Sequence, residues 1–191
     1  NHREIPYYFF SAKTITPSTK TIFWVGGVHA DEFAPTLISW RFLQFLIENP
    51  GDLPKNHHLI YLPMLNLDGW IDGYRNHGYP TRRNALRIDL NRSFYDRMAL
   101  PNYRSQNETE LVLDLIEKYS PEYWIVPHST LNILDLDGIR SPEHLEWIRE
   151  VHAATSYNGA PAIPIKFHGV YAPPNSRKNW SLGKLANEMN G

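Results

Sequence analysis

Short apolar segments of strand length alternate along this chain with longer segments that have the spacing of helices. The strand-like segments are only a few residues long, and the breaks between elements carry glycine, proline or polar turns such as 66–69. This alternation is typical of α/β proteins and predicts a three-layer α/β/α sandwich with a mixed, mostly parallel central sheet. The expected strands are 21–25, 58–62, 123–126 and 163–167, and the expected helices are 35–49, 107–119, 141–155 and 180–190.

The composition fits a single domain over residues 1–191. Hydrophobic residues make up 42% of the chain, which is enough for a sizeable core, and the formal net charge is -1. Without an excess of positive charge the chain lacks the basic face that general nucleic-acid binding requires, so no nucleic-acid partner is expected. No apolar run reaches the roughly 18–20 residues that cross a bilayer, so no membrane partner is expected either.

The chain begins at Asn1 rather than methionine and shows no leader peptide. We therefore expect a cytoplasmic protein, or a periplasmic one from which a leader has been removed. Residues 3–6 read as mid-domain sequence, and we expect the domain to be incomplete at both ends.

Two histidines and a glutamate follow the ends of two expected strands. His29 lies shortly after strand 21–25 with Glu32 three residues later, and His128 lies just after strand 123–126. In an α/β sheet, ligands bind beyond the carboxyl ends of the strands, so both segments should meet at one rim. A lone H-x-x-E pair is common in proteins without a metal. The added histidine completes a ligand set that suits one zinc ion with an open position.

An arginine-rich segment lies between these ligands in the sequence. Arg82, Arg83 and Arg87 precede the run Asp-Leu-Asn-Arg at 89–92. An arginine fork and an asparagine amide can bind a terminal carboxylate, and a second arginine beside the metal can stabilise a developing oxyanion. From the residues alone, Arg82 and Arg87 are expected to be solvated loop side chains.

These motifs together resemble the zinc carboxypeptidases of the carboxypeptidase A type, and most closely their small bacterial branch, the murein peptide amidases. Residues 29–32 (His-Ala-Asp-Glu) resemble the family's H-x-x-E ligands, and His128 resembles its third ligand. Residues 66–69 resemble the family's N-P-D-G turn, with leucine in place of proline. Residues 83–94 resemble the bacterial branch's R-N-A…D-L-N-R-N-F block.

The resemblance implies a carboxypeptidase-like fold, one zinc ion per chain and a role for several further residues. Arg83 would stabilise the oxyanion, while Asn91 and Arg92 would hold the free carboxylate of the substrate. Tyr171 would close over the substrate, and Lys178 falls near the position that lines the side-chain pocket.

Two departures from the family pattern bear on function. Asp31 stands where digestive members carry arginine, which favours the bacterial branch. The family's general base is a glutamate on a strand after the last helix, and no carboxylate of the sequence occupies that place. Glu188 falls on the expected helix 180–190 and is expected to face solvent.

The sequence thus predicts a zinc-dependent hydrolase that cleaves a peptide or amide bond beside a free carboxylate, such as a bond in a murein peptide. One alternative with the same chemistry is an N-acyl amino acid deacylase of the aspartoacylase or succinylglutamate desuccinylase type. An alternative from another class is a catalytically dead, zinc-containing module that binds peptides.

Overall fold

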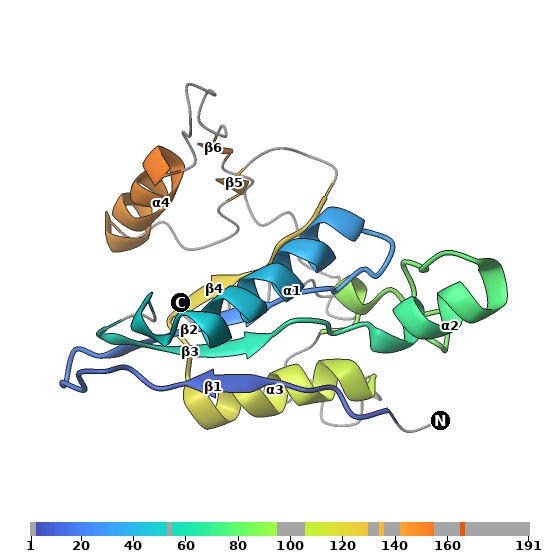
Figure 1. The fold of residues 1–191 in the computed structure, drawn as a ribbon, viewed down its shortest axis with the longest axis horizontal. Helices are drawn as coiled ribbons and strands as arrows, with labels where there is room; N and C mark the ends of the chain where they lie inside the picture. Colours follow the sequence, from blue (N-terminus) through green and yellow to red (C-terminus); the bar gives the residue numbers. More distant parts are fainter. Residues whose placement is uncertain are drawn as a thin grey trace, which may run out of the picture.

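The computed structural model describes residues 3–52, 55–94, 106–129, 134–135, 142–154 and 165–166. Four strands form a mixed sheet in the order β1-β3-β2-β4 (Figure 1). Strands β2, β3 and β4 are parallel, and β1 pairs with β3 in the antiparallel direction. The bounds are Tyr8–Phe10 for β1, Lys20–Val25 for β2, His57–Leu62 for β3 and Tyr123–Ile125 for β4. The mixed, mostly parallel sheet that the sequence predicts is therefore confirmed.

Helices α1 (Phe33–Glu48) and α3 (Asn107–Tyr119) pack on opposite faces of this sheet. Side chains alternate in direction along a strand, so each strand supplies residues to both faces. On one face Phe23 and Ile60 form a buried cluster with Ile116 of α3. On the other face Leu59 and Tyr61 cluster with leucines of α1. These two buried clusters make the three layers of an α/β/α sandwich.

Most expected elements are present close to their expected bounds. The first three expected strands match within one residue, α1 begins two residues early, and α3 has the expected bounds. The α3 helix is capped by a reciprocal pair, in which Gln106 occupies the N-cap position and Thr109 the third helical position. Helix α4 covers Pro142–Ala154 and lies within 141–155. The strand expected at 163–167 is described only as β6 (Ile165–Lys166), which pairs with β5 (Leu134–Asp135). The helix expected at 180–190 lies outside the described residues.

The polar turn expected at 66–69 is instead the start of helix α2 (Leu67–His77). The Asn66 side chain accepts a hydrogen bond from the Gly69 backbone N–H at 2.9 Å, which caps the first turn of the helix. The helix ends at His77 and is followed by Gly78, a C-cap residue with a left-handed φ of 79°. A helix cap and a turn look alike in sequence, because asparagine and glycine favour both.

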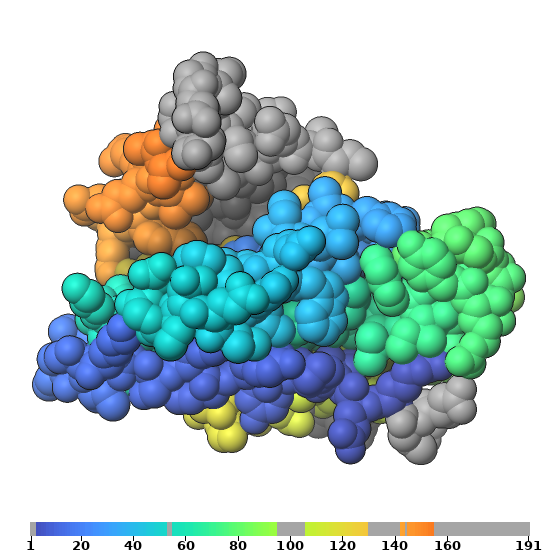
Figure 2. Space-filling model, viewed as in Figure 1, coloured from blue at the N-terminus to red at the C-terminus, as the bar shows by residue number. Residues whose placement is uncertain are grey.

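Helix α1 lies across one face of the molecule and exposes much of its outer surface (Figure 2). Leu37, Ile38 and Ile47 are each more than half exposed, although the opposite side of the helix packs on the sheet. Two single turns of 3-10 helix complete the described elements, at Pro50–Asp52 and Leu90–Arg92. Among the described residues, no helix has both the length and the apolar character needed to span a bilayer.

Candidate metal centre

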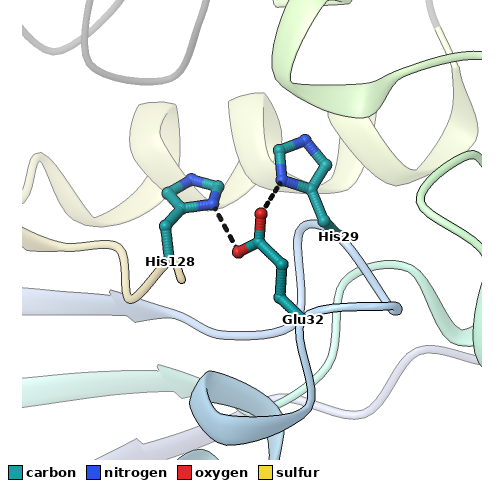
Figure 3. A group of neighbouring side chains, drawn as sticks. All are labelled: His29, Glu32 and His128. Atoms are coloured by element: carbon teal, nitrogen blue, oxygen red, sulfur yellow. Dashed lines mark hydrogen bonds and ion pairs between the residues drawn. The ribbon is translucent and has the colours of Figure 1, made fainter. Parts of the chain in front are cut away.

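The centre lies where the carboxyl ends of β2 and β4 meet. The two strands pair in parallel through Ile22–Trp24 and Tyr123–Ile125, so the segments that follow them leave the sheet at the same rim. His29 lies in the loop after β2, Glu32 occupies the N-cap position of α1, and His128 follows β4. All three predicted ligands therefore converge (Figure 3).

Glu32 lies between the two histidines, with one carboxylate oxygen directed at each ring. The distance from His29 Nδ1 to Glu32 Oε1 is 2.9 Å, and the distance from His128 Nδ1 to Glu32 Oε2 is 3.0 Å. The backbone N–H of Ser129 donates to Oε2 at 2.9 Å. One potential ligand atom from each of the three residues lies within 4.8 Å of the others.

The surroundings of Glu32 favour its ionised form. Burial alone raises the pKa of this carboxyl group. Hydrogen bonds from His128, His29 and the Ser129 backbone outweigh burial and hold the pKa of Glu32 well below its usual range. His29 is only 2% exposed, whereas the His128 side chain is 33% exposed. The centre is thus closed on the His29 side and accessible on the His128 side.

Asp89 contacts the ring nitrogen of His29 that faces away from Glu32. The distance from His29 Nε2 to Asp89 Oδ1 is 2.9 Å. Burial raises the pKa of Asp89, but the hydrogen bond to His29 and the nearby positive charge of Arg82 bring that pKa below its usual value. A carboxylate in this position fixes the tautomer and orientation of a metal-binding histidine and makes the ring a stronger ligand. The sequence reasoning missed this role, although the position of Asp89 beside Asn91 in the 89–92 run was a usable signal.

Arg82 also belongs to the centre, contrary to the expectation that it is a solvated loop residue. Its Nη1 donates to Glu32 Oε1 at 3.3 Å, and its Nε donates to Asp89 Oδ2 at 3.2 Å. The Arg82 side chain nonetheless remains 42% exposed. The Asn66 side chain donates to the Arg82 backbone carbonyl at 3.0 Å and so fixes this part of the chain beside α2. An exposed guanidinium at the edge of a metal centre can also meet an anionic ligand.

The other predicted site residues make contacts within their own loop. Arg83 Nη1 donates to the Arg87 carbonyl at 2.9 Å, and Arg92 Nη1 donates to the Asn91 carbonyl at 2.7 Å. The backbone N–H of Asn91 donates to Asp89 Oδ1, which places the Asn91 backbone next to the centre. Tyr171 and Lys178 lie outside the described residues. The roles predicted for these side chains remain predictions.

The donor set fits a zinc ion. Two imidazole nitrogens and a carboxylate converge, all from residues that can present an unprotonated donor atom, and this is the ligand pattern of catalytic zinc sites. One ligand atom from each residue lies within 4.8 Å of the others, a spacing that a single ion can bridge. The Asp89 contact supplies the outer support that such sites require. His29, Glu32 and His128 would hold the ion.

The sequence matches one protein-family model, and the fold resembles those of several solved structures. A family model described as "Zinc carboxypeptidase" matches residues 2–132. The carboxypeptidase A of Helicoverpa armigera has a similar structure, with a TM-score of 0.66 and 15% identity over 98% of this chain and 54% of that one. Bovine thrombin-activatable fibrinolysis inhibitor, solved in complex with tick carboxypeptidase inhibitor, has a TM-score of 0.60 and 17% identity over 89% of this chain and 68% of that one.

An aspartoacylase family protein from Mesorhizobium loti also shares the fold, with a TM-score of 0.50 and 12% identity over 86% of this chain and 55% of that one. No curated protein matches the sequence. The chain spans about half the length of the carboxypeptidase A with which it shares its fold.

Proposed function

Because the chain belongs to the zinc carboxypeptidase family, whose model matches residues 2–132, we propose that it hydrolyses a peptide or amide bond next to a free carboxylate. The observation that carries this proposal is the convergence of His29, Glu32 and His128 at one rim of the sheet. Bound zinc supplies a Lewis acid that polarises a carbonyl group and activates water at neutral pH. The residues around it determine which substrate is held and how.

The arginine-rich loop supports binding of an anionic substrate. Asn91 and Arg92 are proposed to bind the free carboxylate that marks the end of the substrate. The resemblance to the family implies Arg83 as the arginine that stabilises the oxyanion. The contacts favour Arg82 for this role, because its guanidinium lies against Glu32 and Asp89 while that of Arg83 is directed to the Arg87 carbonyl.

The proposed substrate is a murein peptide with a terminal diaminopimelate or a γ-D-glutamyl linkage. The runner-up is an N-acyl amino acid deacylase, and the fold shared with an aspartoacylase family protein is the observation in its favour. Both reactions use the same metal chemistry and differ in the acyl group. The residues 66–69, which resemble the peptidase N-P-D-G motif, favour the peptide substrate.

The experiment is a substrate panel on the intact, zinc-loaded protein with two matched variants, Arg82→Gln and Arg83→Gln. We expect cleavage of murein peptides and not of acetyl-aspartate or succinylglutamate. We expect Arg82→Gln to lower kcat by roughly 100- to 1000-fold, the usual cost of losing one oxyanion donor, and Arg83→Gln to remain near wild type. Zinc content is measured for each variant, so that loss of metal is not mistaken for loss of the donor.

The opposite outcomes are equally specific. A large loss in Arg83→Gln with a normal Arg82→Gln would return the oxyanion role to Arg83. Cleavage restricted to acyl-aspartate or succinylglutamate would identify a deacylase. Tight binding of murein peptides with no turnover would identify a catalytically dead binding module.

A further inference from the structure

The loop that carries Arg82 and Asp89 is closed by one asparagine. The Asn84 side-chain carbonyl accepts from the backbone N–H groups of Leu86 and Ile88, at 3.1 and 3.0 Å. Its backbone N–H donates to the Ile88 carbonyl at 3.0 Å, and its backbone carbonyl accepts from Arg87 at 2.9 Å. Arg87 has a positive φ of 60°, a conformation that side chains other than glycine rarely adopt. The turn is therefore held by bonds to Asn84 rather than by the preference of its own residues.

The same side chain attaches this turn to the start of α3. Asn84 Nδ2 donates to Gln106 Oε1 at 3.0 Å and to Glu108 Oε1 at 3.2 Å. Asn84 is only 6% exposed, so these bonds are made largely away from solvent, where a lost partner is costly. Burial raises the pKa of Glu108, and the hydrogen bond from Asn84 acts in the opposite direction. The Asn84 side chain thus uses its oxygen for the loop and its nitrogen for the helix.

One residue on each side of this turn, Arg82 before it and Asp89 after it, reaches the metal centre. Arg82 precedes it and contacts Glu32, and Asp89 follows it and contacts His29. The closure of the turn places Arg82 and Asp89 side by side, at 3.2 Å from Nε to Oδ2. A displacement of the turn would therefore move both contacts at once.

We propose that Asn84 is a positioning residue, which holds Arg82 and Asp89 against the metal centre through its attachment to Gln106 and Glu108 at the start of α3. This inference rests on the proposed function, since it concerns the residues that support zinc and substrate. Asn84 itself contacts none of the three zinc-binding residues in the described structure. Its effect on the reaction would pass through Arg82 and Asp89.

An exchange of donor and acceptor tests this attachment. Asn84→Asp keeps an oxygen for the loop N–H groups but loses the donor to both Gln106 and Glu108, and it brings the carboxyl groups of residues 84 and 108 together. Adding Glu108→Gln returns a donor at position 108, so the bond forms again in the reverse direction. Tyr61→Phe is the matched control for stability, because it removes a buried hydrogen bond to the Ser39 carbonyl at 2.6 Å on the other face of the sheet.

The readouts are zinc affinity by competition with a chelator, kcat and KM, and the melting temperature, all on the intact protein. We expect Asn84→Asp to weaken zinc affinity and lower kcat by up to roughly 10-fold, the low end of the cost of losing a direct outer partner of a metal ligand, because Asn84 acts one contact further away. We expect the double variant to recover most of both losses. Tyr61→Phe should lower the melting temperature while leaving zinc affinity and kcat near wild type.

Three results would overturn the proposal: an Asn84→Asp variant with wild-type zinc affinity, a double variant that recovers nothing, or an equal loss of zinc affinity in Tyr61→Phe. Zinc affinity is measured without substrate. If the wild-type protein hydrolyses none of the peptides, the proposed function fails, while the affinities of the four proteins still decide the role of Asn84.

Discussion

At the scale of single residues, the centre is organised around the Glu32 carboxylate. Two histidine rings, a backbone N–H and the Arg82 guanidinium all converge on its two oxygens. A buried carboxylate requires such partners, because an unpaired charge removed from water is strongly unfavourable. The histidines are therefore held in place before any metal binds, and less ordering remains to be done on binding.

The outer contact of Asp89 gives a graded prediction for zinc affinity. Asp89→Asn should weaken zinc binding by roughly 10- to 100-fold, because an amide supports the His29 ring less strongly than a carboxylate does. His128→Ala should abolish stoichiometric binding, because it removes a ligand atom. Chelator competition and elemental analysis measure both. Asp72→Asn, which alters a carboxylate on α2 instead, serves as the control and should bind zinc normally. Equal affinities in wild type and Asp89→Asn would contradict the supporting role.

The site residues differ in how well sequence could locate them. The sequence alone predicts that the three metal ligands, His29, Glu32 and His128, are neighbours. Each follows the end of a strand, and the carboxyl ends of parallel strands lie at one rim of an α/β sheet. Arg82 could not be separated from Arg83 and Arg87 in this way, because all three lie in one loop. Which of them reaches Glu32 depends on how the turn at 84–88 closes, and that depends on contacts with α3.

At the scale of elements, helix α2 is built for close approach to the segment 79–82. A Cβ atom added at Gly69 would lie 2.6 Å from Asn66 Nδ2 and 2.7 Å from the Thr81 carbonyl. The Thr81 backbone N–H donates to the Gly69 carbonyl at 2.9 Å, so the two segments are in direct contact. Glycine lowers the helix propensity of α2, but its lack of a side chain allows the segment that leads to Arg82 to pack directly against the helix.

The close contact at Gly69 predicts a loss of stability on substitution. Gly69→Ala should lower the free energy of unfolding by about 1–3 kcal/mol, since the backbone carbonyl of Thr81 cannot move aside freely. Gly51→Ala is the control, because its Cβ would meet no atom within 4 Å, and it should be neutral or slightly stabilising. Urea denaturation of both variants measures the difference. A Gly69→Ala variant as stable as Gly51→Ala would show that the two segments are not rigidly packed.

The N-terminal segment is attached to α2 by ion pairs from Arg3 to Asp68 and Asp72. The hydrogen bond from Arg3 holds the pKa of Asp72 below its ordinary value of 3.8. A carboxyl group with a lowered folded pKa stabilises the fold above its unfolded pKa and loses that effect as the pH falls through the folded value. The melting temperature of Arg3→Ala should therefore lie below that of wild type above about pH 4, and the gap should close in stronger acid. A gap that does not depend on pH would contradict this explanation.

The elements that sequence located best are those with a repeated pattern. Helix α3 and strand β2 bury residues at a regular spacing, and strand β3 is a short run of consecutive buried residues, so the sequence marks all three clearly. Strand β1, which is not among the expected strands, has only three residues, too few for a periodic pattern to identify it. The sequence at the start of α2 predicts a turn because asparagine and glycine favour turns, and the Asn66–Gly69 hydrogen bond shows that Asn66 is instead a helix cap.

At the scale of the whole molecule, the centre joins two segments that lie 96 residues apart in the sequence. The β2–β4 pairing brings the loop after residue 25 next to the segment after residue 125, and Glu32 bonds across the gap to His128 and Ser129. A metal ion held by His29, Glu32 and His128 would cross-link the same two segments. Its binding energy would then add to the stability of the sheet.

Zinc should therefore raise the stability of the molecule by mass action. A free zinc concentration 1,000 times the dissociation constant should add about 4 kcal/mol to the free energy of unfolding. Thermal unfolding with buffered zinc and with a chelator measures the gain. His128→Ala should show no such dependence on zinc. A wild-type melting temperature that does not change with the zinc concentration would contradict binding at this centre.

The long separation of the ligands in sequence has a consequence for the order of events during synthesis. His29 and Glu32 leave the ribosome together, but His128 lies 96 residues after Glu32. At roughly 5–20 residues per second, translation takes about 5–20 s to cover that interval. Throughout this time the nascent chain carries two of the three ligands, and β2 has not yet paired with β4. The complete set of three ligands can therefore form only after residue 128 has emerged and β2 has paired with β4, so full zinc affinity should appear late in folding.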